Sequence, residues 1–295
     1  MIEASKKRQL LKALVASGKS LVVPGAGDGL GARLIGKAGF EAAYMSGYCV
    51  EGSYGFPDVG YLGMSEMAAR AATMAEAVDI PLMCDCDTGY GNVVNVTRTV
   101  REFERAGVAA IQLEDQELPK KCGSMAGKRI VSIEEMTGKI RAAVDARQDP
   151  NLMVIGRTDA AAIEGMDRAI ERMHAYADAG ADLLMVLGPY SPTDVVRLGY
   201  ESPKPVVYLN SESLTMPMIP AAELHKLGIN IVVFPLALLL SASRAMERTL
   251  EQMRLHGTTL DIIDDSMVSW NRFNDIMGLP AVKALEERYG PKVVA

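Results

Sequence analysis

The fold is decided by a short pattern that is clearest in residues 105–114, RAGVAAIQLE. Gly107 follows a helix-like segment, and glycine readily adopts the left-handed conformation in which helices end. The run after it is short and continuously apolar, which is typical of a parallel strand buried on both faces. The sequence therefore predicts a helix that ends at Gly107 and passes directly into a buried strand.

The same helix–glycine–strand pattern occurs three more times, in residues 37–45 (KAGFEAAYM), 178–186 (DAGADLLMV) and 226–234 (KLGINIVVF). Further apolar runs bring the predicted strands to eight: 20–24, 42–46, 81–85, 109–114, 152–157, 183–186, 206–210 and 231–234. Amphipathic helical segments lie between them, most clearly at 65–78, 93–106, 133–147 and 166–179. Eight such units in 295 residues predict a (β/α)₈ TIM barrel.

An open, doubly wound sheet is the alternative fold. The glycine-rich stretch 25–31, GAGDGLG, resembles a dinucleotide-binding loop. However, no acid follows the second predicted strand, where the ribose of a dinucleotide would need one. The stretch 17–20, SGKS, precedes a strand, whereas a phosphate-binding loop follows one. Both features therefore favour the barrel.

Composition narrows the class of protein. The net charge is −6 and the basic residues do not cluster, which argues against a nucleic-acid partner. The longest apolar stretch, residues 229–242, contains a proline and is shorter than the roughly 18 residues of a membrane span. The N-terminal segment is charged and lacks an apolar signal core. We therefore expect a cytoplasmic protein without a membrane partner, whose four cysteines are free thiols.

The sequence predicts two regions, a catalytic barrel over residues 1–255 and a helical arm over residues 256–295. His256 and Gly257 interrupt the last long helical segment. Beyond them, Trp270, Phe273 and Met277 recur at helical spacing. This apolar face can pack on the barrel of its own chain or on a neighbouring subunit, and both arrangements agree with the pattern.

Polar residues follow several of the predicted strands, at the end of a barrel where catalytic groups gather. They are Ser46, Gly47, Tyr48 and Asp58 after the second strand; Asp85 and Asp87 after the third; Glu114, Lys120, Lys121, Cys122, Gly123 and Ser124 after the fourth; Arg157 after the fifth; and Asn210 after the seventh. Four carboxylates at one mouth would repel one another without a cation. Hard oxygen ligands therefore predict Mg²⁺ or Mn²⁺.

Arg157 and Cys122 are the other two candidates. A guanidinium binds a carboxylate or phosphate through two parallel hydrogen bonds, although Arg157 could instead pair with Asp159 or Glu114. Cys122 lies between Lys121 and glycine in a polar segment. Neighbouring positive charge is expected to lower the thiol pKa, and glycine lets the segment move. The three histidines fall on or just after helical segments, so no histidine triad or zinc site is expected.

Six short motifs resemble those of the isocitrate lyase/phosphoenolpyruvate mutase superfamily, in the same order and at similar spacing over about residues 13–255. They are SGY at 46–48, PDVG at 57–60, DCDTGYG at 85–91, LEDQ at 113–116, KKCG at 120–123 and RTDA at 157–160. The resemblance implies a (β/α)₈ barrel whose eighth helix is exchanged between subunits, usually in a homotetramer that is a dimer of dimers. It also implies Mg²⁺ or Mn²⁺, with Asp85 as the direct ligand and Asp58, Asp87 and Glu114 holding its water molecules.

The KKCG segment is typical of the short lyase branch of this superfamily. It implies a carbon–carbon lyase that cleaves a 2-hydroxy di- or tricarboxylate, such as a 2-alkylmalate or methylisocitrate, to a 2-oxo acid and a carboxylate. Two positions depart from the usual pattern: Ser124 stands where histidine is usual, and Leu187 where glutamate is usual. The alternatives are a mutase or hydrolase of phosphonopyruvate or carboxyphosphonoenolpyruvate, an oxaloacetate hydrolase or decarboxylase, and a catalytically weak dicarboxylate-binding protein.

The lyase reading gives each candidate a role. Cys122, beside Lys121, would be the general acid that protonates the carbanion left by bond cleavage. Asp58, Tyr48 or a hydroxide on the metal would be the base. The residues expected to hold the substrate carboxylates or to close over them are Ser46, Gly47, Arg157, Asn210, Gly123 and Ser124.

Overall fold

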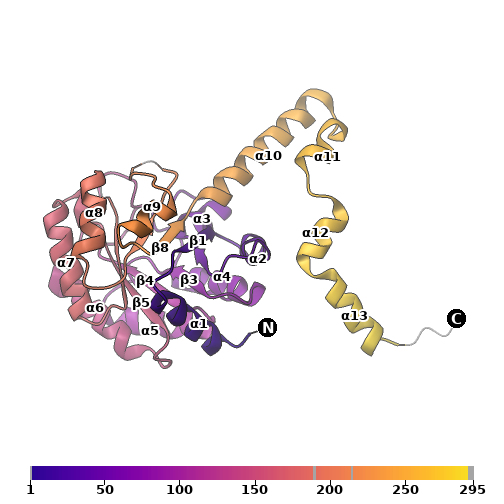
Figure 1. The fold of residues 1–295 in the computed structure, drawn as a ribbon. Coiled ribbons are helices and arrows are strands. Elements are labelled where there is room, and N and C mark those ends of the chain that lie inside the picture. Colours follow the sequence, from indigo (N-terminus) through magenta and orange to yellow (C-terminus); the bar gives the residue numbers. More distant parts are fainter. Residues whose placement is uncertain (1, 189–190, 214, 292–295) are drawn as a thin grey trace. The chain divides into compact units, whose positions relative to one another are not determined.

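Eight parallel strands form a barrel in the computed structural model, which describes residues 2–188, 191–213 and 215–291 (Figure 1). The strands are β1 Leu21–Ala26, β2 Ala43–Met45, β3 Leu82–Asp85, β4 Ala110–Glu114, β5 Met153–Thr158, β6 Leu183–Val186, β7 Val207–Leu209 and β8 Ile231–Phe234. Their order is β6-β5-β4-β3-β2-β1-β8-β7. A parallel bridge between Leu184 and Val206 joins β6 to β7 and closes the ring. All eight predicted strands and the barrel are confirmed, and the doubly wound alternative is wrong.

Helices alternate with these strands around the outside of the barrel (Figure 1). They are α1 Ala4–Ala16, α2 Gly29–Lys37, α3 Gly47–Ser53, α4 Met64–Ala77, α5 Val93–Arg105, α6 Ile133–Ala146, α7 Met166–Asp178, α8 Pro192–Glu201 and α9 Ala221–Lys226, with a short 3₁₀ turn at Ala160–Ala162. The glycine-rich stretch 25–31 runs from the end of β1 into the start of α2, where the Asp28 side chain accepts a hydrogen bond from the Gly31 amide at 2.7 Å.

Glycine ends the helices where the sequence predicts it. Gly39, Gly107, Gly180 and Gly228 all have positive φ, at 85°, 86°, 105° and 83°. Since this left-handed conformation costs other L-residues about 1–2 kcal/mol, glycine fixes the point where each helix turns into its strand. At the start of α6, the Ser132 hydroxyl accepts a hydrogen bond from the Glu135 amide at 3.2 Å and caps the helix.

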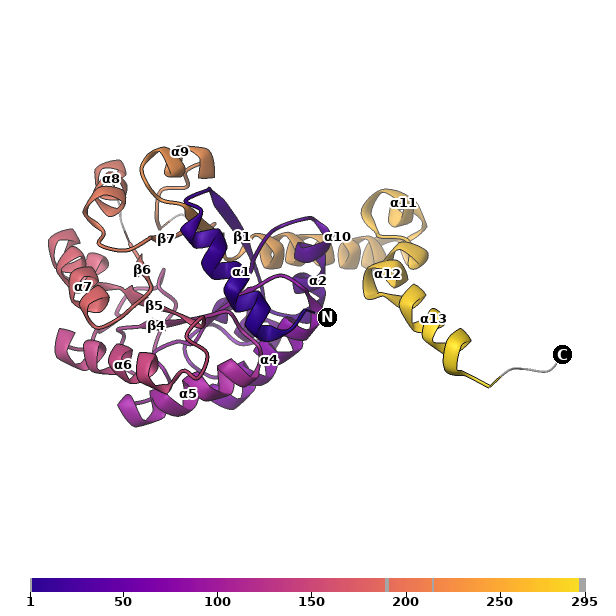
Figure 2. The same ribbon diagram turned by 60° about the horizontal axis from the view of Figure 1, so that its bottom comes forward.

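Side chains alternate in and out along each strand, so alternate residues fill the barrel interior. The inward residues include Val23 of β1, Met83 of β3 and Ile155 of β5, all fully buried. Helix α1 lies across the end of the barrel where the strands begin, and its Leu11 belongs to the same buried cluster (Figure 2). Arg8 anchors this helix by donating to the Val108 carbonyl at 2.9 Å. Because α1 covers the end where the strands begin, the open mouth of the barrel is the end where the strands finish.

The chain divides into two compact units, Met1–Leu239 and Leu240–Ala295. The boundary falls inside α10 (Ala237–His256), which ends before Gly257 with its φ of 65°. The second unit continues with α11 Ile263–Ser266, α12 Trp270–Met277 and α13 Leu279–Tyr289. Within the single described chain, Trp270 is 79% exposed. None of the described helices combines the length and apolarity needed to cross a membrane.

The helix-ending role of glycine predicts opposite effects of two neighbouring substitutions. A Cβ at Gly39 would meet nothing within 4 Å, so Gly39→Ala should destabilise the protein through its backbone alone, by about 1–2 kcal/mol. Gly36 lies inside α2, where a Cβ would be 3.5 Å from Val78, an ordinary contact. Gly36→Ala should therefore stabilise the protein by up to about 1 kcal/mol. Calorimetric unfolding at one protein concentration measures both changes, and shifts of the same sign would contradict the prediction.

Candidate active site

The mouth of the barrel encloses a small cavity of about 40 Å³. Its described lining comprises Tyr44, Ser46, Tyr48, Asp58, Asp85, Cys122, Gly123, Ser124, Arg157, Leu187, Leu209, Ser211, Pro235 and Leu236. The inward alternation of the strands explains several of these positions: Met83 fills the interior of β3, and Asp85, two residues later, reaches the mouth. Arg157 follows Ile155 on β5 in the same way. The structure thus brings together at one cavity most of the residues predicted to form the site.

Asp85 is oriented by donors on one of its two oxygens. Its Oδ1 accepts from Gln112 Nε2 at 3.0 Å and from the Asp87 amide at 3.2 Å, and Gln112 is held in turn by Tyr44 at 2.8 Å. Its Oδ2 lies beside Gly47, where an added Cβ would be only 2.9 Å away. Glycine at the start of α3 is therefore needed for the Asp85 carboxylate to occupy this place.

The turn after β3 holds Asp87 in an unusual backbone conformation. Its φ is 48°, in the left-handed region that few residues other than glycine adopt. Tyr90 in the same turn has a φ of 59°. Backbone strain of this kind is concentrated at functional sites, where the surrounding structure maintains it. This turn brings the Asp87 carboxylate close to Asp58 and Asp85. Asp58, Asp85, Asp87 and Glu114 are called the acid cluster below.

Lys120 places a positive charge inside this acid cluster. Its ammonium forms ion pairs with Asp58 and, at 2.7 Å, with Asp87, and its side chain is only 3% exposed. Burial raises the pKa of Asp87 to about 6, against the opposing effect of Lys120. Although burial alone would lower it, Asp87 and Asp58 raise the pKa of Lys120 well above its ordinary value. The lysine therefore stays charged, and the carboxylates still gain from further positive charge.

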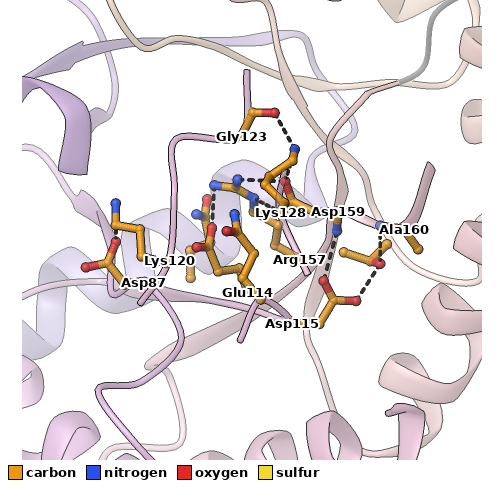
Figure 3. A network of polar contacts seen from close by, with 12 residues as sticks. Asp87, Glu114, Asp115, Lys120, Gly123, Lys128, Arg157, Asp159 and Ala160 are labelled. Carbon is orange, nitrogen blue, oxygen red and sulfur yellow. Dashed lines mark hydrogen bonds and ion pairs between the residues drawn. The ribbon is translucent and has the colours of Figure 1, made fainter. Parts of the chain in front are cut away.

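Arg157 is fixed by carboxylates on both sides (Figure 3). Its Nη1 lies 2.8 Å from Glu114 Oε2, and its Nε donates to Asp159 Oδ2 at 3.0 Å. Asp159 also accepts from Lys128 at 2.7 Å, and Lys128 donates to the Gly123 carbonyl of the Cys122 loop, residues 118–129. Although burial would raise the pKa of Asp159, Arg157 and Lys128 lower it below its ordinary value. The pairing predicted as an alternative for Arg157 is present, and the residue also lines the cavity.

Asp115 forms the floor beneath this network. It is fully buried and accepts from the Asp159 amide at 2.9 Å, from Thr158 at 2.6 Å and from the Tyr176 hydroxyl at 2.6 Å. Arg172 of α7 balances its charge at 3.1 Å. Because this network ties the end of β5 to α7, Asp159 has a rigid backbone from which to position Arg157 and Lys128.

The Cys122 loop lies over the cavity. The Cys122 amide donates to the Asp58 carbonyl at 2.9 Å, and the next residue, Gly123, packs against Leu187 so closely that a Cβ there would be 1.5 Å from Leu187 Cδ2. The Ser124 hydroxyl is 2.7 Å from that of Ser213 and 3.0 Å from that of Thr215. The loop is thus held against β6 and against the segment after β7.

The Cys122 pKa differs from the sequence prediction. Burial raises the pKa of the thiol above its ordinary value, and Asp58 raises it further, outweighing Arg157 and Lys120. The predicted lowering is wrong because burial of the thiol, with Asp58 beside it, outweighs the effect of the two cations. Near neutral pH Cys122 is therefore a neutral thiol, which can donate a proton.

The acid cluster fits a divalent cation that is held largely through water. Among the described residues, no three His, Cys, Asp or Glu side chains converge closely enough to hold an ion directly. Mg²⁺, however, often takes only one or two carboxylates and keeps several water molecules. Glu114 Oε1 is buried and has no hydrogen-bond partner in the described part of the chain, and burial raises the pKa of Glu114 well above its ordinary value despite Arg157. A metal-bound water would satisfy this oxygen, and the ion's charge would stabilise the carboxylate.

Five predicted residues are not part of the described cavity lining. Gly47, Asp87 and Glu114 lie directly behind it, beside Asp85 or Arg157, whereas Lys121 and Asn210 are engaged elsewhere. Lys121 pairs through its backbone with the Gln116 side chain, and its ammonium donates to the Gly127 carbonyl at 3.3 Å. Asn210 is buried and uses its side chain to hold Ile219 through two hydrogen bonds, at 2.9 and 3.0 Å. Conversely, Lys120 was placed at the mouth without a role, and Lys128 was not predicted at all, yet both reach the network. Their proximity to Cys122 in the sequence indicated that they could belong to the site, but it did not show which lysine side chains point inward.

The chain matches one family model and resembles proteins of known activity. The model described as phosphoenolpyruvate phosphomutase matches residues 11–254. The 2,3-dimethylmalate lyase of Eubacterium barkeri is 45% identical over 290 residues, covering 98% of this chain and 99% of that protein. The 2-methylisocitrate lyase of Bacillus subtilis (strain 168) is 40% identical over 252 residues, covering 85% of this chain and 83% of that protein.

Solved structures agree with these relatives. Oxaloacetate acetylhydrolase in complex with 3,3-difluorooxalacetate superposes with a TM-score of 0.93 at 32% identity, covering 99% of this chain and all of that chain (100%). Phosphonopyruvate hydrolase in complex with oxalate and Mg²⁺ superposes with a TM-score of 0.88 at 31% identity, covering 96% of this chain and 99% of that one. The likeness extends across several chemistries, so the reaction has to be argued from the site itself.

The Lys128 contacts predict that one ammonium holds the Cys122 loop closed. Lys128→Met should remove its hydrogen bonds to Gly123 and Asp159, each worth about 1.5–3 kcal/mol as a charged hydrogen bond. Amide hydrogen exchange over residues 120–127 should then become faster. The matched control is Lys226→Met, which removes an exposed ammonium paired only with Glu223. Equal exchange of this loop in both variants would show that Lys128 does not hold it.

Proposed function

This chain belongs to the PEP mutase/isocitrate lyase superfamily, and we propose that it is a Mg²⁺-dependent carbon–carbon lyase. Its substrate would be a 2-hydroxy polycarboxylate of the 2-alkylmalate or methylisocitrate type, cleaved to a 2-oxo acid and a carboxylate. One observation carries the proposal: the protonated thiol of Cys122 lines the same small cavity as Asp85 and Arg157. A buried proton donor facing the substrate is what a reaction that produces a carbanion requires.

Substrate binding would rely on the charged residues that line the cavity. The Arg157 guanidinium faces the cavity and is held in place by Glu114 and Asp159, so it would orient a substrate carboxylate without first having to be ordered. The amides at the start of α3, near Ser46 and Gly47, supply further donors at the same position.

Proton removal from the 2-hydroxyl is assigned to Asp58. Tyr48 also lines the cavity, but burial raises its pKa and the nearby Cys122 and Asp58 raise it further. The phenol therefore keeps its proton near neutral pH and is a poor base. Asp58 is ion-paired with Lys120 and so is a carboxylate that can accept the proton.

Cleavage then moves two protons, one from the 2-hydroxyl to Asp58 and one from Cys122 to the substrate. As the hydroxyl proton leaves, its oxygen forms a carbonyl and the bond between carbons 2 and 3 breaks. The electron pair of that bond is left on carbon 3, delocalised into the adjacent carboxylate. The Cys122 S–H donates its proton to carbon 3, and the closed loop keeps competing water away from this carbanion.

Asp85 would hold the metal directly, with Asp58, Asp87 and Glu114 holding its water molecules. When bound, Mg²⁺ (or Mn²⁺ in its place) would stabilise negative charge on the substrate's 2-oxygen and adjacent carboxylate. We further propose that the catalytic region and the helical arm assemble as a homotetramer. The exposed Trp270 and Leu260 of the arm supply apolar surface of the kind that subunit interfaces bury.

Removing the thiol tests the reaction. The assay measures release of a 2-oxo acid in the presence of Mg²⁺ from 2-alkylmalates, 2-methylisocitrate, oxaloacetate and phosphonopyruvate. We expect release from at least one of the 2-hydroxy acids, the 2-alkylmalates and 2-methylisocitrate. Cys122→Ser should lower kcat by about 10²–10⁴-fold and leave the unfolding temperature unchanged. Because the active form is the thiol and its pKa is raised, the unchanged protein should not lose turnover through Cys122 between pH 7 and 9.

The same thiol-to-hydroxyl change at Cys49, which does not line the cavity, is the control and should preserve turnover. Full activity of Cys122→Ser would rule out the general-acid role. Turnover of oxaloacetate or phosphonopyruvate, without cleavage of any 2-hydroxy acid, would assign the chain to the alternative hydrolase or mutase chemistry.

The metal site is tested without relying on turnover. A cation that binds only the folded protein raises its unfolding temperature in a concentration-dependent manner. Mg²⁺ should therefore stabilise the unchanged protein, and Asp85→Ala should abolish the effect. Asp178→Asn, an exposed carboxylate at the end of α7, should preserve it. An equal Mg²⁺ response in the Asp85 variant would refute Asp85 as the direct ligand.

A further inference from the structure

A buried lysine on α6 reaches the strained turn that follows β3. The Lys139 side chain is 3% exposed, and its ammonium donates a hydrogen bond to the Thr88 carbonyl at 3.3 Å. Thr88 is fully buried and directly follows Asp87 in the chain. The same ammonium lies 3.5 Å from Glu135, which is 51% exposed, so water screens much of their attraction. Burial of an ammonium is costly, and this pairing offsets little of the cost, which points to a role for Lys139 in the turn itself.

A buried threonine on α5 reaches the next residue of the same turn. The Thr99 hydroxyl lies 3.1 Å from the Gly89 carbonyl and 3.1 Å from the Asn95 carbonyl of its own helix, so it links the turn to α5. Gly89 has a φ of 84° and packs so closely on α5 that a Cβ there would be 2.5 Å from Val96 Cγ2. The turn is therefore attached to α6 and α5 through two consecutive carbonyls.

Asp87 depends on this attachment because its own backbone opposes its position. Its φ of 48° lies in the left-handed region, whose conformational cost the surrounding contacts have to offset. In this conformation its carbonyl accepts from the Glu114 amide at 2.9 Å, and its carboxylate lies 2.7 Å from the Lys120 ammonium. A turn released by α5 and α6 would relax toward the right-handed or extended region and withdraw the carboxylate from the acid cluster.

We infer that Lys139 and Thr99 are positioning residues that hold Asp87 in the acid cluster. Neither belongs to the described lining of the mouth cavity, so both act through the turn. The inference rests on the proposed function, because it connects these two residues to the Mg²⁺ site of that proposal. Loss of a group that orients a metal ligand typically weakens metal binding about 10–100-fold.

Titration of the full-length protein with Mg²⁺, followed by calorimetry without substrate, tests the inference separately from catalysis. Lys139→Met should weaken Mg²⁺ binding at least about tenfold, whereas Lys139→Arg, which keeps a charged donor, should bind Mg²⁺ within about threefold of the unchanged protein. Thr99→Val keeps the branched shape but removes the hydroxyl, and should also weaken binding about tenfold. If Lys139→Met does not fold, the Mg²⁺ affinity of Thr99→Val decides.

Two further measurements distinguish action through the turn from general loosening of the protein. Once one attachment is lost, the other holds less, so the double variant Lys139→Met/Thr99→Val should weaken Mg²⁺ binding by less than the product of the two single losses. The Gly89 amide donates to the Cys86 carbonyl at 2.9 Å within the turn. Without Mg²⁺, its hydrogen exchange should become about tenfold faster in each single variant.

Two matched controls remove the same groups elsewhere in the barrel. Lys7→Met removes another buried ammonium, which donates to the Ala75 and Val78 carbonyls from α1, at the end opposite the mouth. Thr137→Val removes a buried hydroxyl that donates to the Glu134 carbonyl of its own helix. Both variants should keep the Mg²⁺ affinity of the unchanged protein, whatever happens to their unfolding temperatures.

The outcomes separate this inference from the proposed reaction. If the affinities change as expected but no 2-hydroxy acid is cleaved, the role of Lys139 and Thr99 stands and the lyase assignment fails. If 2-hydroxy acids are cleaved but both single variants bind Mg²⁺ as tightly as the unchanged protein, the lyase assignment stands and the inference is wrong. Equal losses in the Lys7 and Thr137 controls, or losses that multiply in the double variant, would also overturn it. Absence of Mg²⁺ binding by the unchanged protein would refute both the metal site and this inference.

Discussion

Four carboxylates buried at one end of a barrel impose the constraint on which the site depends. Removing ionised groups from water is costly, and like charges placed together raise the cost further. The chain offsets this cost by placing Lys120 between Asp58 and Asp87, and Arg157 beside Glu114. The raised pKa of Glu114 and its unpaired Oε1 show that this compensation is incomplete. The remaining imbalance is what gives the mouth its affinity for a further cation.

The compensating charges also connect the Cys122 loop to the ends of the strands. Lys120 and Lys128 both belong to the Cys122 loop, whereas Asp87 and Asp159 belong to the fixed ends of β3 and β5. Each ion pair therefore attaches the loop to the barrel while it neutralises a carboxylate. Asp115 makes this attachment rigid from below, because it fixes the Asp159 backbone to α7 through Thr158 and Arg172. The position of the loop and the charge balance of the site consequently depend on the same contacts.

The sequence predicted the features that depend on local rules. Glycines such as Gly107 and Gly180 end helices because of their own backbone freedom, and apolar runs become strands whatever their partners are. The alternation of strand side chains then placed Asp85 and Arg157 at the mouth. The direction of a loop side chain follows no such rule. Lys121 turns away because Gln116, on the preceding segment, captures its backbone, and Lys120 turns inward as a result.

The protonation state of Cys122 is a second property that the sequence alone did not predict. Counting the charges that flank Cys122 along the sequence predicts a lowered thiol pKa, because lysine is its neighbour. In the folded chain, Lys120 is paired with Asp58, and Arg157 with Glu114 and Asp159. Burial then has the largest effect on the pKa of the Cys122 thiol. A thiolate would be a nucleophile, but a neutral thiol is an acid. Burial, together with Asp58 of the acid cluster, raises the pKa of Cys122 and keeps it protonated, so the same buried mouth that can attract a metal also keeps its proton donor in the protonated form.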